Sequence, residues 1–96
     1  MRRKNIDNVR VLYFYAYWDG REELKIDCNK VCKRHKVFMK AINCEDPHGV
    51  NESIRWKVRT CPTVLVLDSG REIYRGHGSD ARFDMEAIFG EYESGR

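Results

Sequence analysis

The fold is decided by VRVLYFYAYWDGRE, residues 9–22. Its first nine residues form a nearly unbroken apolar and aromatic run, which is typical of a central strand covered on both faces. Asp19 and Gly20 then end the strand. Residues 22–36 place apolar, cysteine and histidine side chains on one helical stripe, with acidic residues at the start and basic residues near the end, as the helix dipole favours. The stripe consists of Leu24, Cys28, Val31, Cys32 and His35.

The same patterns continue along the rest of the chain. They predict a strand at 37–44, a short helix at 50–56, strands at 63–67 and 72–75, and a last helix at 80–92. In the short helix we expect Val50, Ile54 and Val58 to face inward. The first crossover makes its two strands parallel, whereas the later hairpin is antiparallel. The sequence therefore predicts an α/β fold of order β-α-β-α-β-β-α, with a four-stranded mixed sheet and helices on both faces.

The size and composition of the chain fit one globular domain. It has 96 residues, 42% of them hydrophobic and 34% charged, which is ordinary for a folded protein. We assign residues 9–93 to the domain, 1–8 to a basic N-terminal tail and 94–96 to a C-terminal tail. No apolar run reaches the roughly 18 residues that cross a bilayer, and we expect no secretory signal. A monomeric cytoplasmic protein with reduced thiols and no membrane partner is expected.

The segment WKVRTCPT, residues 56–63, resembles the aromatic-x-Val/Ile-Arg-x-x-Pro-Thr stretch of the thioredoxin superfamily. Residues 43–45 and 68–72 are similar to two further segments of that family. The resemblance covers about residues 9–92 and implies a minimal thioredoxin-like or glutaredoxin-like domain. It also implies that Pro62 is a cis-proline, which faces the redox motif of the family across a groove.

The redox motif itself is missing from this chain. The Trp-Cys-Gly-Pro-Cys motif of thioredoxins corresponds to Trp18–Glu22, so Asp19 and Glu22 stand at the two cysteine positions. Thiol–disulfide exchange needs an attacking and a resolving thiol, and a carboxylate can be neither. We expect both carboxylates to cap the helix; acid–base catalysis, the alternative, would need a closed pocket. We therefore assign no catalytic role to Asp19 or Glu22.

The four cysteines offer further chemistry. If Cys28 stood at the start of the first helix, as a redox cysteine would, that helix would have only about nine residues. With a rise of about 1.5 Å per residue, it would be too short to cross back along the sheet. A start at Glu22 makes Cys28 and Cys32 core residues, with a redox pair as the alternative. Zinc held by these two cysteines with His35 and Cys44 is a weaker alternative, because strand and helix place Cys44 and His35 far apart. We expect Cys44 to be a core residue and no metal to bind.

Cys61 precedes the predicted cis-proline. We expect it to fill an apolar position beside the groove; the alternative is a reactive thiol near the former active site. The leading hypothesis is a domain without dithiol redox activity or cofactor, which binds a protein or peptide partner. Thr60 and Cys61 would pair with an extended peptide, as the family implies. The predicted groove consists of Trp18, Asp19, Gly20, Trp56, Thr60, Cys61, Pro62, Gly76 and His77.

Two other functions remain open from the sequence. The first is a thiol–disulfide oxidoreductase using Cys61 or the Cys28/Cys32 pair. The second is nucleic-acid association through the lysine and arginine clusters, which the mild net charge of +3 does little to support.

Overall fold

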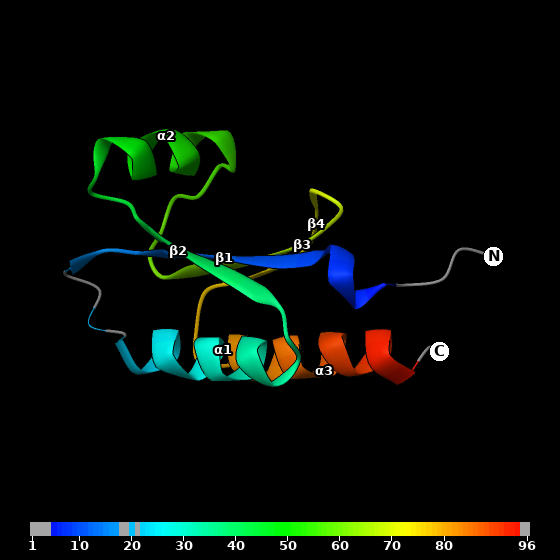
Figure 1. Cartoon of the computed structure of the whole chain (residues 1–96). Helices are drawn as coiled ribbons and strands as arrows, with labels where there is room; N and C mark the ends of the chain where they lie inside the picture. Colours follow the sequence, from blue (N-terminus) through cyan, green and yellow to red (C-terminus); the bar gives the residue numbers. More distant parts are fainter. Residues whose placement is uncertain (1–4, 18–19, 21, 95–96) are drawn as a thin grey trace.

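A computed structural model of the chain describes residues 5–17, 20 and 22–94 (Figure 1). After a short 3-10 helix, the elements follow the predicted order β-α-β-α-β-β-α. They are η1 (Ile6–Asn8), β1 (Val9–Tyr15), α1 (Glu22–Arg34), β2 (Phe38–Asn43), α2 (Pro47–Arg55), β3 (Thr63–Asp68), β4 (Arg71–Gly76) and α3 (Ala81–Ser94).

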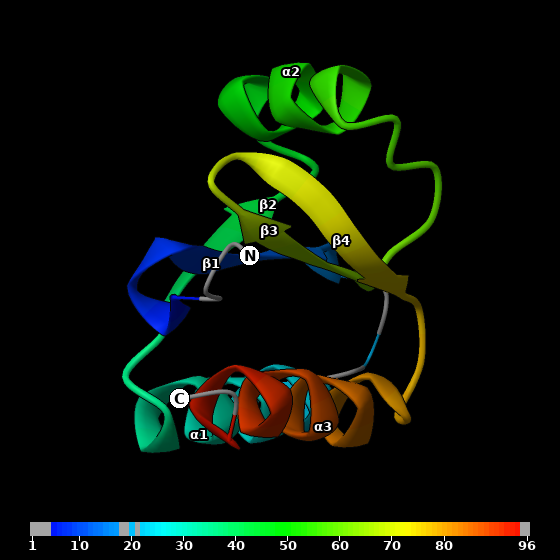
Figure 2. The ribbon, with the colours of Figure 1, turned by 90° about the vertical axis from the view of Figure 1, so that its right-hand side faces the viewer.

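The four strands form one mixed sheet in the order β2-β1-β3-β4. β1 pairs in parallel with β2 and antiparallel with β3, and β3 pairs antiparallel with β4. Helices α1 and α3 lie side by side on one face of the sheet, and α2 lies on the other (Figures 1 and 2). The apolar run of residues 9–15 is therefore an internal strand between two helical layers, as predicted.

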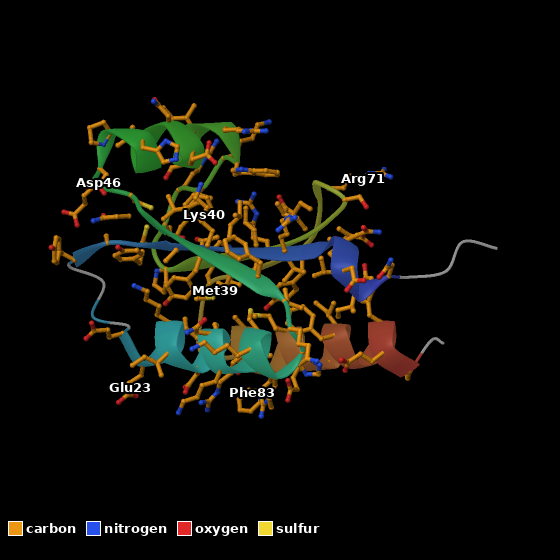
Figure 3. All side chains as sticks on the ribbon, viewed as in Figure 1. Glu23, Met39, Lys40, Asp46, Arg71 and Phe83 are labelled. Atoms are coloured by element: carbon orange, nitrogen blue, oxygen red, sulfur yellow. The ribbon has the colours of Figure 1, made fainter. Side chains whose placement is uncertain are left out.

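Each face of the sheet carries its own apolar cluster. The larger lies between the sheet and helices α1 and α3, and Tyr13, Met85 and Phe89 are fully buried in it. The smaller lies under α2 and centres on Phe14 and Leu65. Neighbouring residues of a strand point to opposite faces. In Figure 3 Met39 accordingly points toward α1 and α3, and Lys40 points to the side of α2.

Helix α1 begins at Glu22, as predicted, and buries Cys28 and Cys32 at 0% and 1% exposure. His35, just after the helix, joins it to α3, because its Nδ1 and Nε2 lie 2.7 and 2.9 Å from carboxylate oxygens of Glu93 and Glu86. No helix in the described ranges is both long and apolar enough to cross a membrane.

Two predictions about individual elements are wrong. β1 ends at Tyr15 rather than at Tyr17, and Tyr17 is 86% exposed. Helix α2 begins earlier than predicted, at Pro47, and its Val50 and Ile54 are exposed instead of facing inward. The reason is the close approach of Gly49 to β2, where an added Cβ would overlap the carbonyl oxygen of Asn43. The helix faces the sheet through this glycine and not through its larger apolar residues.

Candidate functional site

Three chain segments meet at one edge of the sheet. The parallel strands β1 and β2 both end there, and the antiparallel strand β3 begins there, with Thr63 paired to Phe14. The backbone N–H of Cys44, directly after β2, donates to the carbonyl oxygen of Tyr15 at 2.8 Å. The N–H of Tyr17 donates to Oε1 of Glu45 at 2.7 Å. These bonds fix the residues after β1 against those after β2.

The segment before β3 contains the predicted proline. The Cys61–Pro62 peptide bond is cis. The hydroxyl of Thr63 donates to the carbonyl oxygen of Thr60 at 2.6 Å, and Nδ1 of His77 lies 3.0 Å from the same hydroxyl oxygen. Because a hydroxyl has one proton, we assign Nδ1 of His77 as the donor in the second bond. His77 therefore braces the loop that carries Cys61 and Pro62.

The other end of this loop is held by Arg75 on β4. Its Nη2 donates to the carbonyl oxygen of Trp56 at 2.6 Å, and its Nη1 donates to that of Lys57 at 3.0 Å. Glu72 on the same strand orients the guanidinium through two bonds of 2.9 Å. Such a bidentate pair fixes the plane of the arginine side chain. The loop is thus fastened to β4 at its start and to His77 near its end.

Two thiols meet between this loop and α2. Sγ of Cys61 lies 2.9 Å from Sγ of Cys44, and no disulfide joins them. The hydroxyl oxygen of Ser53 lies 3.4 Å from Sγ of Cys44 and 2.8 Å from the carbonyl oxygen of Gly49. Sequence reasoning missed this pair, since it placed Cys44 in the core and considered Cys61 as a single thiol.

Both thiols line an open pocket of about 450 Å³ between α2 and the loop. Its apolar residues are Val50, Ile54 and Val58, of which Val50 and Ile54 are 43% and 71% exposed. Two basic side chains, those of Lys57 and Arg59, also line it. The pocket therefore combines an apolar wall, positive charge and two thiols.

No protein-family model matches the chain, but solved structures do. Thioredoxin f2 of Chlamydomonas reinhardtii aligns with a TM-score of 0.73 at 15% identity, covering 93% of this chain and 82% of that one. This chain has a thioredoxin fold. Thioredoxin O2 of Arabidopsis thaliana gives 0.73 at 18% identity, covering 86% and 73%. The germline-specific thioredoxin Deadhead of Drosophila melanogaster gives 0.67 at 25% identity, covering 90% and 83%.

The structure describes only some of the residues of the predicted groove. Trp18 and Asp19 lie outside the described residues. Glu22 is exposed and lines a separate pocket of about 240 Å³, together with residues that include Tyr15 and Lys25. The two pockets share none of the lining residues that the structure describes. Glu22 at the start of α1 therefore does not line the pocket that contains the two thiols.

The other predicted groove residues occupy different environments. Thr60 and His77 are exposed, Cys61 is half-buried and Pro62 is buried. Gly20 is exposed, with a φ of 63° that suits glycine. Trp56 is half-buried and packs against the smaller apolar cluster under α2. Gly76 is buried, and an added Cβ would overlap the hydroxyl group of Tyr74.

The thiols of α1 differ chemically from the pair beside Pro62. Burial, with the charge of Asp27, raises the pKa of Cys28 to about 11, and burial raises that of Cys32 to about 12. Because the thiolate is the nucleophile, such thiols are unreactive near neutral pH. Cys28 and Cys32 are therefore buried core residues, and their raised pKa values disfavour the redox alternative built on them.

The positions of the four residues in the zinc alternative do not suit a shared metal site. Cys28 and Cys32 belong to the cluster under α1 and α3, whereas Cys44 packs on the opposite face of the sheet. Both ring nitrogens of His35 face carboxylates of α3. Within the part of the chain that the structure describes, no three histidine, cysteine or acidic side chains are grouped to hold a metal ion.

Proposed function

We propose that this thioredoxin-like domain binds an extended polypeptide through residues 59–62 and the adjoining pocket, without the dithiol of thioredoxins. The observation that carries the proposal is the loop itself. Arg59 and Thr60 are exposed and lie outside any strand, directly before the cis peptide bond at Pro62. The resemblance to thioredoxins implies that backbone at this position pairs with a bound peptide, and such pairing needs no sulfur chemistry.

The loop is held ready for such pairing. Arg75 fixes the carbonyl groups of Trp56 and Lys57, and the hydroxyl of Thr63, itself held by His77, fixes the carbonyl group of Thr60. A segment already fixed in its bound shape loses less conformational entropy when a partner binds. The hydrogen bonds around the loop therefore favour recognition by backbone pairing.

The pocket beside the loop indicates the chemistry of the partner. The exposed Val50 and Ile54 offer an apolar wall to one side chain of a bound peptide. Lys57 and Arg59 supply positive charge at the same pocket, which favours an acidic neighbour on the peptide. We therefore propose a partner segment in which a leucine-like side chain is flanked by glutamate or aspartate.

Binding of fluorescein-labelled, cysteine-free peptides tests this proposal by fluorescence anisotropy. A peptide with leucine flanked by glutamates should bind more tightly than one with lysines in their place, and this preference should shrink at high salt. Ile54→Glu should weaken binding at least about tenfold, because it places a charge on the apolar wall and repels the acidic peptide.

The matched control is Phe83→Glu. Phe83 is 61% exposed on α3, in the layer opposite α2 (Figure 3), so its substitution should leave the affinity unchanged. Equal weakening by the two variants, or equal affinity for the acidic and basic peptides, would contradict the proposed site.

A further inference from the structure

We propose that Cys44 and Cys61 form a redox-active dithiol, which is oxidised to an intramolecular disulfide by small disulfides of the oxidised glutathione class. This site is distinct from the helix start where thioredoxins carry their two cysteines. It goes beyond the proposed peptide binding and does not depend on it, because the disulfide of glutathione reacts with the thiols directly and no bound peptide is needed.

The first support is the position of the two sulfur atoms. They lie 2.9 Å apart, and a disulfide has an S–S distance of about 2.05 Å, so closure needs an approach of about 1 Å. The residues are 17 positions apart in the sequence and come from different segments. Cys61 lies in a loop outside the sheet, so a small torsional change there can supply the approach.

The second support is access. Cys44 and Cys61 are both half-buried and line the open pocket, whereas Cys28 and Cys32 are buried in the core. Reactive cysteines typically lie in partly exposed sites with positive charge nearby. Lys57 and Arg59 line this pocket and also favour the approach of glutathione, which carries net negative charge.

The reaction proceeds in two exchange steps. The thiolate of Cys61 attacks one sulfur of oxidised glutathione, and the glutathione S–S bond breaks as a Cys61–glutathione disulfide forms. The thiolate of Cys44 then attacks Sγ of Cys61 and releases the second glutathione. The two protein thiols lose two electrons and two protons, and one glutathione disulfide becomes two glutathione thiols. Reduced glutathione in excess reverses both steps.

The order of attack follows from the surroundings of each thiol. Cys61 belongs to the loop beside the exposed Thr60, where an incoming disulfide can approach. Cys44 lies beneath α2, where Ser53 and Cys61 both contact its sulfur. Cys61 therefore suits the attacking role, and Cys44 suits the resolving role.

Oxidation by glutathione disulfide, followed by acid quenching, alkylation and peptide mass spectrometry, tests the proposal on the whole chain. The wild-type protein should lose two thiols and yield one disulfide that links Cys44 to Cys61. Cys28 and Cys32 serve as internal controls, and they should stay reduced and become alkylated only after unfolding. Excess reduced glutathione should restore four thiols.

Single variants test the roles within the pair. Cys44→Ser should stop at a 1:1 glutathione adduct on Cys61, and Cys61→Ser should form an adduct at least about tenfold more slowly. Cys44→Ala, checked for native circular dichroism, gives the same test if the serine variant fails to fold. A wild-type protein that keeps four thiols, a disulfide containing Cys28 or Cys32, or faster adduct formation in Cys61→Ser than in Cys44→Ser would overturn the proposal.

Discussion

The guanidinium group of Arg75 donates to the carbonyl oxygen of Trp56 at 2.6 Å, which ties the edge strand β4 to the end of α2. Trp56 is the C-cap residue directly after α2, so its carbonyl has no partner inside the helix. Oε1 of Glu72 lies 2.9 Å from the same Nη2 and holds the guanidinium in place. An ion pair on an edge strand thereby holds the start of the loop toward Pro62.

Arg75→Met should lower the free energy of unfolding by about 1–2 kcal/mol, because two carbonyl groups lose a charged donor and the side chain is only partly exposed. Urea unfolding measures this change. Arg71→Met is the control, since Arg71 is an exposed residue of the same strand (Figure 3) and its loss should change stability by less than about 0.5 kcal/mol. Equal losses in both variants would argue against the role given to Arg75.

Gly49→Ala should destabilise the protein by about 1–3 kcal/mol, because the new Cβ meets the backbone of Asn43 and pushes α2 away from β2. The shift should also separate Ser53 from Cys44 and slow formation of the disulfide. Gly90→Ala in α3 is the matched control. An added Cβ there meets open space, so thermal unfolding should show a gain of about 0.5–1 kcal/mol.

His77→Leu should weaken binding of the acidic peptide several-fold while lowering stability by less than about 1 kcal/mol, since the exposed imidazole braces the loop through one hydrogen bond from its Nδ1. Anisotropy and urea unfolding separate the two effects. His48→Leu, an exposed position on α2 outside the lining of the thiol pocket, should change neither. A large loss of stability without a loss of affinity would assign His77 to the fold rather than to the site.

The stability of the reduced protein should fall as the pH rises from about 9 to 12. Burial raises the pKa of Cys28 to about 11 and of Cys32 to about 12, and burial with a hydrogen bond to Asp68 raises that of Tyr92 to about 12. In this window the unfolded chain loses protons that the folded chain keeps, so the stabilisation is complete below pH 9 and is lost toward pH 12.

Urea unfolding at several pH values, with reductant present, measures this slope. Cys32→Ala removes one of these titrating groups, so its unfolding free energy should decline less steeply with pH than that of the wild type. A flat or rising profile above pH 9 would contradict the burial of these groups.

Much of the scaffold could be predicted from local pattern. The start of α1 at Glu22 followed from its length requirement, and the stripe of Leu24, Cys28, Val31 and Cys32 is buried as predicted. The prediction for α2 had the wrong face, because periodicity favoured Val50 and Ile54. Gly49 lies so close to the carbonyl oxygen of Asn43 that the helix packs on β2 through this glycine, and local sequence pattern does not predict an approach between two elements.

The sequence by itself determined the order of strands and helices and the absence of cysteine from residues 18–22, since both depend on residue types at fixed local spacing. Tertiary structure alone decided which cysteines meet. Cys44 and Cys61 are separated in the sequence by α2 and a loop. Hydrophobic periodicity is a local signal, so it cannot predict the distance between residues next to β2 and β3, which lie on either side of β1. Packing of the ends of β1 and β2 against the start of β3 sets that distance, and with it the chemistry available to the site.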